Sequence, residues 1–172
     1  MSNAYGFAPQ SVVVVLGTRP EIVKLAHIIR LLGDAAHVIH TGQHYDQNLS
    51  AEFFSDFDLP PPHHFLAVGS ATRGFQIGET IRRLDEHLAE VGPKAVLVQG
   101  DTNSVAGGAL AANAGGIFLC HIEAGLRSHD RAMPEEHNRI IADHLADLCC
   151  APTQVAIDNL AAEGLPSQRV TL

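Results

Sequence analysis

The chain has 172 residues, of which 46% are hydrophobic and 17% charged, a balance typical of a globular domain. Its net charge of −8, with histidines neutral, argues against nonspecific binding to nucleic acid or anionic membranes. No apolar run approaches the ~20 residues of a membrane span, and residues 1–10 lack a signal-peptide pattern. We therefore expect one domain over residues 11–172, preceded by a disordered or tag-derived stretch over residues 1–10.

The three cysteines of the chain are Cys120, Cys149 and Cys150, and their spacing is not that of a metal site. Adjacent Cys149 and Cys150 end a hydrophobic run and are expected to be buried thiols. Free thiols fit a reducing compartment, so we expect a cytoplasmic protein.

The first half of the chain alternates strand and helix patterns. Residues 11–16 form a β-branched run closed by Gly17, which is typical of a strand buried on both faces. A helix then begins around Pro20 and Glu21, which suit its first turn, and ends at Gly33. The remaining predictions in this half are a strand over 37–40, a helix over 46–57, a weak strand over 63–68 and an amphipathic helix over 72–91.

The second half continues the alternation. We predict strands over 95–99 and 117–122, separated by a helix over 102–114 that is rich in alanine and glycine. A polar loop then leads to a helix over 134–148. Its inward residues are expected to be Ile140, Ile141, Leu145 and Leu148. A short strand over 148–151, a helix from a Thr153 cap to Gly164, and a strand beginning at 169 complete the series.

This alternation predicts an α/β fold, a doubly wound parallel sheet that is Rossmann-like. In the usual strand order 3-2-1-4-5-6, strands one and four are neighbours at the switch point, where ligands bind outside the carboxyl ends. The ends of strands one, four and five place Gly17–Arg19, Gly100–Asp101 and Glu123 on one rim. We expect the functional site there.

The turn at Gly17 holds a single glycine, so it matches neither a dinucleotide fingerprint nor a P-loop. It has two interpretations. In one, Arg19 is solvated at an ordinary helix start. In the other, the helix amides, Arg19 and Lys24 form an anion site.

Three carboxylates stand near this rim, and each has a structural alternative. Asp101 either caps the following helix or faces the ligand at the switch point. Glu123 ends an apolar strand, where partial desolvation suits proton transfer, unless it pairs with Arg127. Glu135 either stabilises the first turn of its helix with an i,i+4 pair to Arg139 or serves the site.

Metal and nucleophile chemistry are not indicated. The histidines do not form an H-E-x-x-H motif or a clean ligand pair with a carboxylate, so we expect no metal. There is no G-x-S-x-G sequence and no cysteine in a basic loop, which argues against nucleophilic catalysis.

Five motifs resemble those of the UDP-N-acetylglucosamine 2-epimerases. They are Gly17–Lys24 (GTRPEIVK), Thr41–Asp46 (TGQHYD), Gln99–Ser104 (QGDTNS), His121–Arg127 (HIEAGLR) and Met133–Arg139 (MPEEHNR). The resemblance implies the first half of a fold like that of type-B glycosyltransferases, in which two Rossmann-like domains face each other across a cleft. The resemblance implies that this chain covers the first domain and lacks the second, C-terminal one.

The family interconverts UDP-N-acetylglucosamine and UDP-N-acetylmannosamine with no oxidised cofactor, by eliminating UDP to leave 2-acetamidoglucal and adding it back. The resemblance implies that Asp101, Glu123 and Glu135 are catalytic, with the order of proton transfers left open. It implies substrate contacts from the following residues: Arg19, Lys24, His44, Arg127 and Arg139.

The resemblance also implies that this chain alone is inactive and binds UDP-sugars weakly, and that the intact protein is a homodimer. Alternatives are a hydrolysing 2-epimerase that releases N-acetylmannosamine, or an epimerase of a diacetamido UDP-sugar. A glycosyltransferase and a non-catalytic interaction domain are the alternatives from other classes.

Overall fold

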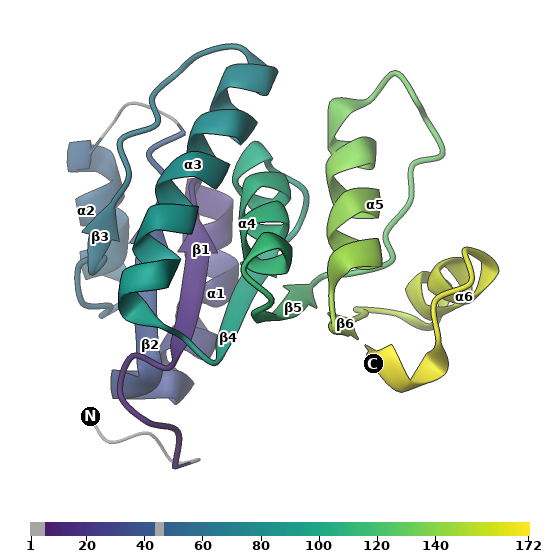
Figure 1. Cartoon of the computed structure of the whole chain (residues 1–172), viewed down its shortest axis with the longest axis horizontal. Helices are drawn as coiled ribbons and strands as arrows, with labels where there is room; N and C mark the ends of the chain where they lie inside the picture. The colour runs from purple at the N-terminus through teal and green to yellow at the C-terminus, as the bar shows by residue number, and fades with distance from the viewer. Residues whose placement is uncertain (1–5, 44–46) are drawn as a thin grey trace.

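The computed structural model describes residues 6–43 and 47–172. Within these residues the chain forms one sheet whose strands are all parallel, in the order β3-β2-β1-β4-β5-β6-β7 (Figure 1). The predicted doubly wound order is therefore confirmed. The strands are β1 Val12–Leu16, β2 Ala36–His40, β3 His64–Phe65, β4 Ala95–Gln99, β5 Phe118–Ile122, β6 Leu148–Cys150 and β7 Val170–Thr171.

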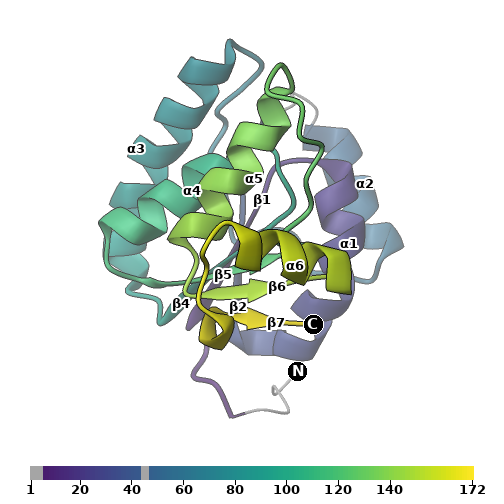
Figure 2. The same cartoon turned by 90° about the vertical axis from the view of Figure 1, so that its right-hand side faces the viewer.

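Helices cover both faces of the sheet. Helices α1 and α2 lie on one face, and α3, α4 and α5 lie side by side on the other (Figures 1 and 2). No helix among the described residues is both long and apolar enough to cross a bilayer. The helices are α1 Arg19–Leu32, α2 Gln47–Asp56, α3 Arg73–Val91, α4 Asn103–Ala114, α5 Pro134–Leu145 and α6 Gln154–Ala162, with short 3-10 turns at Gly33–Ala35 and Ser167–Arg169.

The stretch before β1 lies partly outside the described residues, since the structure describes the chain from Gly6 onward. From Gly6 it approaches the sheet, and the backbone N–H of Gln10 donates to the carbonyl of Asp34 over 2.8 Å. Ser11 is buried.

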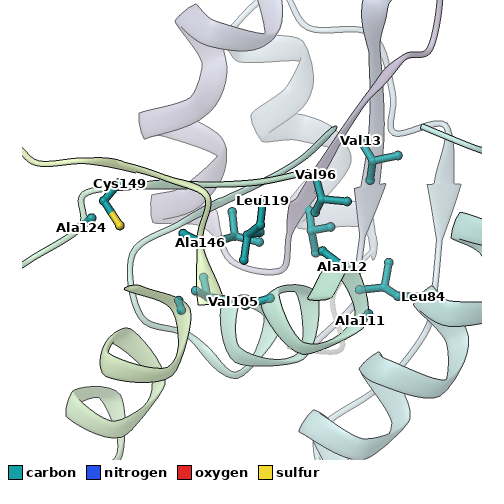
Figure 3. Packing of buried hydrophobic residues seen from close by; sticks show 14 of the residues in the cluster. Val13, Leu84, Val96, Val105, Ala111, Ala112, Leu119, Ala124, Ala146 and Cys149 are labelled. Carbon is teal, nitrogen blue, oxygen red and sulfur yellow. The ribbon is translucent and has the colours of Figure 1, made fainter. Parts of the chain in front are cut away.

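The core has two parts, one on each face of the sheet. Alternation along β1 sends Val13 and Val15 to the cluster under α3 and α4, shown in part in Figure 3, and sends Val14 and Leu16 to the cluster under α1. All five residues of β1 are buried, as a strand covered on both faces requires.

Helix α4 packs closely because its side chains are small. A Cβ on Gly107 would lie 2.6 Å from the side chain of Thr80 on α3, and one on Gly108 would lie 3.0 Å from Val98 on β4. The alanine- and glycine-rich composition therefore lets α3 and the sheet approach α4 together. This packing fixes the start of α4 beside the rim.

Helix α5 differs from the prediction. It ends at Leu145 rather than at residue 148, because Ala146 is extended and leads into β6. The predicted inward residues Ile140, Ile141 and Leu145 are only partly buried. The residues that α5 buries are mostly polar: Glu136, Asn138, Arg139, Ala142 and Asp143.

In the described part of the chain, two helices, α4 and α6, have an N-cap side chain that accepts a backbone hydrogen bond. Thr153 caps α6 as predicted, its hydroxyl accepting from the Ala156 N–H over 3.2 Å. Thr102, not Asp101, caps α4, accepting from the Val105 N–H over 3.3 Å. The interpretation of Asp101 as the cap was wrong, so its carboxylate is free for other contacts.

Candidate functional site

A cleft of about 230 Å³ opens at the carboxyl ends of β1, β4 and β5. It is the place where a doubly wound sheet binds its ligand. The loops after these strands line it together with the first turns of α1 and the side of α5. The lining residues are Thr18, Pro20, Glu21, Lys24, Gln99, Gly100, Asp101, Thr102, Glu123, Leu126 and Arg139.

Glu123 lies in the turn that follows β5, with a positive φ of 69°. Its carboxylate oxygens lie 2.7 and 3.0 Å from Nζ of Lys24 on α1, and Nε2 of Gln99 also donates to it. The alternative that Glu123 pairs with Arg127 was therefore wrong. Its cation comes from α1, 99 residues earlier in the sequence.

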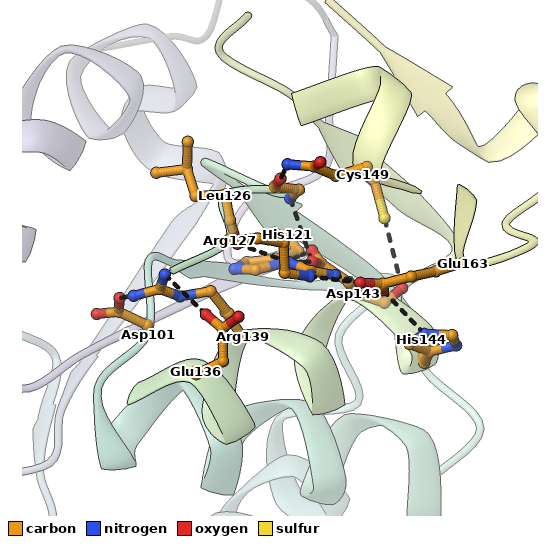
Figure 4. A network of polar contacts seen from close by, with 12 residues as sticks. Asp101, His121, Leu126, Arg127, Glu136, Arg139, Asp143, His144, Cys149 and Glu163 are labelled. Atoms are coloured by element: carbon orange, nitrogen blue, oxygen red, sulfur yellow. Dashed lines mark hydrogen bonds and ion pairs between the residues drawn. The ribbon is translucent and has the colours of Figure 1, made fainter. Parts of the chain in front are cut away.

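Asp101 faces the cleft from the end of β4, and its carboxylate forms an ion pair with the guanidinium of Arg139 (Figure 4). The same guanidinium lies 3.1 Å from Oε2 of Glu136. Arg139 therefore pairs with Glu136, three residues before it, and does not form the predicted alternative i,i+4 pair with Glu135. Two carboxylate–cation pairs, Glu123–Lys24 and Asp101–Arg139, thus stand on the rim.

Glu136 is buried and holds the loop that precedes α5. Its carboxylate accepts from the N–H groups of Ser128 and His129 over 3.0 and 2.9 Å. Burial opposes ionisation of Glu136, but these backbone bonds and Arg139 outweigh it and lower its pKa below the ordinary value. Glu135, by contrast, is exposed and does not line the cleft.

The start of α1 was one possible anion site, and the structure fills it with the chain's own carboxylate. Glu21 is 2% exposed, and Oε2 accepts from the Gly17 N–H over 2.9 Å and the Thr18 hydroxyl over 2.8 Å. Its other oxygen accepts from Thr102 over 2.9 Å. Burial raises the pKa of Glu21 despite these bonds. The sequence indicated only an acid in a first helical turn.

Two residues predicted to contact substrate, Arg19 and Arg127, do not line this cleft. Arg19 is exposed, and its guanidinium carbon lies 5.3 Å from the ring centre of Phe53. The side chain of Arg127 is 2% exposed and is enclosed by acidic partners. His44 lies outside the described residues.

Asp143 is the centre of a buried network that sequence reasoning missed. Its carboxylate lies 2.7 Å from Nδ1 of His121 and 2.7 Å from Nη1 of Arg127, and accepts from the Gly125 N–H over 3.1 Å (Figure 4). Burial opposes its charge, but His121 and Arg127 outweigh that effect and lower its pKa. An acid in the middle of a helix with an apolar pattern gave no signal of this position.

His121 extends the network to the rim. Its Nε2 lies 2.8 Å from the carbonyl oxygen of Gly100, while Nδ1 faces Asp143. The ring therefore bridges the Asp143 carboxylate and the Gly100 carbonyl. The network therefore holds Gly100, next to Asp101, and Gly125, two residues after Glu123. It positions both rim carboxylates without touching the cleft.

Arg127 joins this network to α6. Its guanidinium donates to both carboxylate oxygens of Glu163 over 2.6 Å, and these bonds lower the pKa of Glu163. Among the described residues, no group of histidines, cysteines and acids is arranged to hold a metal ion.

Comparison with known proteins agrees with this arrangement. A profile described as UDP-N-acetylglucosamine 2-epimerase matches residues 33–172. The chain belongs to this family. Among its relatives, the UDP-N-acetylglucosamine 2-epimerases of Methanocaldococcus jannaschii and Methanococcus maripaludis are 46% and 45% identical to it over 160 and 158 residues. Each match covers 91% of this chain but only 44% and 43% of the relative.

Solved structures of the family superpose closely on the chain. The Methanocaldococcus jannaschii enzyme in complex with UDP-GlcNAc and UDP matches with a TM-score of 0.90 at 44% identity, over 94% of this chain and 45% of that one. The Neisseria meningitidis enzyme bound to UDP-GlcNAc matches with a TM-score of 0.88 at 32% identity, over the same shares of the two chains.

A more distant structure, MurG of Acinetobacter baumannii, matches with a TM-score of 0.59 at 12% identity, which concerns the fold alone. The chain thus spans about half the length of its relatives. The predicted half of a type-B glycosyltransferase-like fold is confirmed.

Proposed function

We propose that this chain forms one wall of the active site of a UDP-N-acetylglucosamine 2-epimerase, which interconverts UDP-N-acetylglucosamine and UDP-N-acetylmannosamine. The observation that carries the proposal is the pair of carboxylate–cation contacts, Glu123–Lys24 and Asp101–Arg139, on the rim of one cleft. Epimerisation by elimination requires proton acceptors near the sugar and cations near the leaving diphosphate, and the rim supplies both.

The two cations are suited to the diphosphate. Lys24 is half-exposed, and Arg139 reaches the cleft between two acids. A bound diphosphate competes with the carboxylates for these cations. When Lys24 turns to the phosphate oxygens, Glu123 loses its counter-ion and becomes a better proton acceptor. Binding of the nucleotide sugar would thereby prepare the base.

In the proposed reaction, one rim carboxylate removes the proton on C2. The bond between C1 and the phosphate oxygen then breaks, and its electrons leave with UDP as the C1–C2 double bond forms. Return of UDP to C1, with a proton delivered to the opposite face of C2, completes the change. We assign these proton transfers to Asp101 and Glu123 without ordering them.

The other predicted residues take different places in the proposal. Glu135 is exposed outside the cleft lining, so a catalytic part for it requires movement of the first turn of α5. Arg127 holds the loop after β5 rather than the substrate. Arg19 and His44 remain predicted substrate contacts. The other wall of the cleft would come from the second half found in the relatives.

A second candidate substrate has a specific observation in its favour. The UDP-2,3-diacetamido-2,3-dideoxy-D-glucuronate 2-epimerase of Pseudomonas aeruginosa is 39% identical over 157 residues, 89% of this chain and 44% of the relative. The same chemistry would invert the configuration at C2 of either sugar. Supplying each sugar separately, and identifying the products by mass and NMR, decides between them, and free N-acetylmannosamine as product would indicate the hydrolysing reaction.

The test of the proposal uses a protein that carries this chain together with the second half of its relatives. In D2O, epimerisation places deuterium on C2, which NMR detects. We expect Glu123→Gln and Asp101→Asn each to slow this exchange by about 100-fold or more. Glu86→Gln, a change on the exposed side of α3, is the matched control and should have no effect. Wild-type exchange in both rim variants would refute the proposal.

Two further properties stay proposals. We infer that the protein is cytoplasmic and that its full-length form is a homodimer. Light scattering of the full-length protein tests the second inference, and a monomeric mass would contradict it.

A further inference from the structure

We propose that Cys120 and Cys150 form a peroxide-sensitive dithiol that closes to a disulfide between β5 and β6. The sulfur atoms of the two residues lie 3.8 Å apart. They stand on neighbouring parallel strands, where Cys120 is in register with Leu148 and Cys150 with Ile122. Both thiols are free and partly buried, so a small peroxide can reach them.

Cys149, the neighbour of Cys150, provides a built-in contrast. It is fully buried, and its sulfur lies 3.5 Å from the backbone oxygen of Asp143 on the face covered by α5. Successive side chains of a strand point to opposite faces, so Cys149 cannot reach Cys120. Burial raises the pKa of its thiol to about 12, which keeps it unreactive.

The pair divides naturally into an attacking and a resolving thiol. The hydrogen bond from Cys120 lowers the pKa of Cys150 against the opposing effect of burial, and the same contact raises the pKa of Cys120. The nearby His121 also lowers the pKa of Cys150. Of the two thiols, Cys150 is therefore the one that forms a thiolate more readily.

The proposed chemistry has two steps. The Cys150 thiolate attacks one oxygen of hydrogen peroxide and the O–O bond breaks, which leaves Cys150 as a sulfenic acid. The released hydroxide takes up a proton and leaves as water. The Cys120 thiol then attacks the Cys150 sulfur, the S–O bond breaks, and a second water leaves. Two thiols lose two electrons in total, and one peroxide is reduced to two waters.

The site is coupled to the cleft through the backbone. The carbonyl oxygen of Cys150 accepts from the Ala124 N–H over 3.0 Å, and Ala124 follows Glu123. A disulfide needs a sulfur separation of about 2.05 Å, so closure draws the two strands or their side chains together. Closure therefore acts on the turn that carries Glu123 through this hydrogen bond.

The experiment treats this chain with hydrogen peroxide, then denatures it, alkylates free thiols and measures the mass of the intact protein. We expect a loss of two hydrogen atoms, a single alkylated cysteine that peptide mapping assigns to Cys149, and full reversal by dithiothreitol. Cys149→Ser should still form the bond. Cys120→Ser should stop at a sulfenic acid on Cys150, which dimedone traps.

Several outcomes would overturn the proposal. They are three alkylated thiols after treatment, a bond that includes Cys149, links only between chains, or further oxidation of Cys150 while Cys120 stays free. The wild-type measurement needs no substitution, so a variant that fails to fold does not leave the question open. The measurement also does not depend on epimerase activity, so it stands apart from the proposed function.

Discussion

Glu21 determines which groups on the rim are available to bind an anion. A helix start offers free N–H groups to an anion, and in this chain the anion is internal. Gly17 and Thr18 donate to the same carboxylate oxygen that blocks the α1 terminus. A diphosphate that enters the cleft therefore meets Lys24 and Arg139 rather than the bare end of the helix.

The buried Glu21 carboxylate predicts a particular dependence of stability on pH. Burial raises its pKa in the folded state above the ordinary 4.5, so the folded protein holds this proton more tightly than the unfolded chain. Its contribution to stability is fully present below pH 4.5 and is lost as pH rises through the folded pKa. We expect Glu21→Gln to remove this loss, so the variant gains stability relative to wild type as pH rises.

Urea unfolding of both proteins at a series of pH values from 4.5 upward measures the effect. The exposed Glu86→Gln serves as the control, whose difference from wild type should not follow the same curve. A constant difference between Glu21→Gln and wild type across the series would contradict the assignment of the proton to Glu21.

Positions on the rim were predictable from the sequence, whereas their partners were not. A strand pattern followed by glycine places Asp101 and Glu123 at strand ends, because the carboxyl ends of parallel strands share one edge. Which cation each meets depends on the relative placement of α1 and α5. Lys24 lies 99 residues from Glu123, and no local pattern joins them. That Glu136 is buried and Glu135 exposed likewise depends on how α5 is rotated.

At the scale of elements, the strands and helices followed from the sequence patterns, but the buried face of α5 did not. Its inward face was assigned to Ile140 and Ile141, yet the helix buries Glu136, Arg139 and Asp143. Hydrophobic periodicity assumes that buried positions are apolar, and that assumption fails where a helix carries a paired ionic network. The loop between β5 and α5 depends on this network and on its contact with α6.

Replacing Gly125 with alanine tests how much a single methyl group in that loop destabilises the protein. Its φ is +80°, and a Cβ would lie 2.3 Å from the carbonyl oxygen of Ala156 on α6. Gly164 has a similar φ of +83° but nothing within 4 Å, so it isolates the backbone strain alone. We expect Gly164→Ala to cost about 1 kcal/mol of unfolding free energy and Gly125→Ala roughly 3 kcal/mol.

Chemical denaturation of the two variants under identical conditions gives the comparison. The larger loss in Gly125→Ala would come from the clash between the new methyl group and the α6 backbone. Equal losses in the two proteins would show that the loop yields without disturbing α6, and the close packing of these elements would then not limit stability.

At the scale of the whole molecule, the described chain supplies one wall of a cleft. Its relatives are about twice as long, and 44% of the Methanocaldococcus jannaschii enzyme is matched. The sheet order, and with it the rim, was predictable from the alternation of strands and helices. The extent to which the site encloses a ligand was not predictable in this way, because it depends on residues that face the rim from outside this sheet.

This division predicts that the chain alone binds UDP weakly and does not turn over UDP-N-acetylglucosamine. The mouth of the cleft presents Lys24 and Arg139 to the diphosphate, and the described residues that line it come from the sheet rim, α1 and α5. We expect calorimetry to give a dissociation constant for UDP that is larger than micromolar for the chain. The Lys24→Met variant should have a still larger dissociation constant. The Methanocaldococcus jannaschii enzyme, measured in parallel, provides a two-walled control. Micromolar binding by this chain, or turnover near the rate of that enzyme, would mean that one wall suffices for the site.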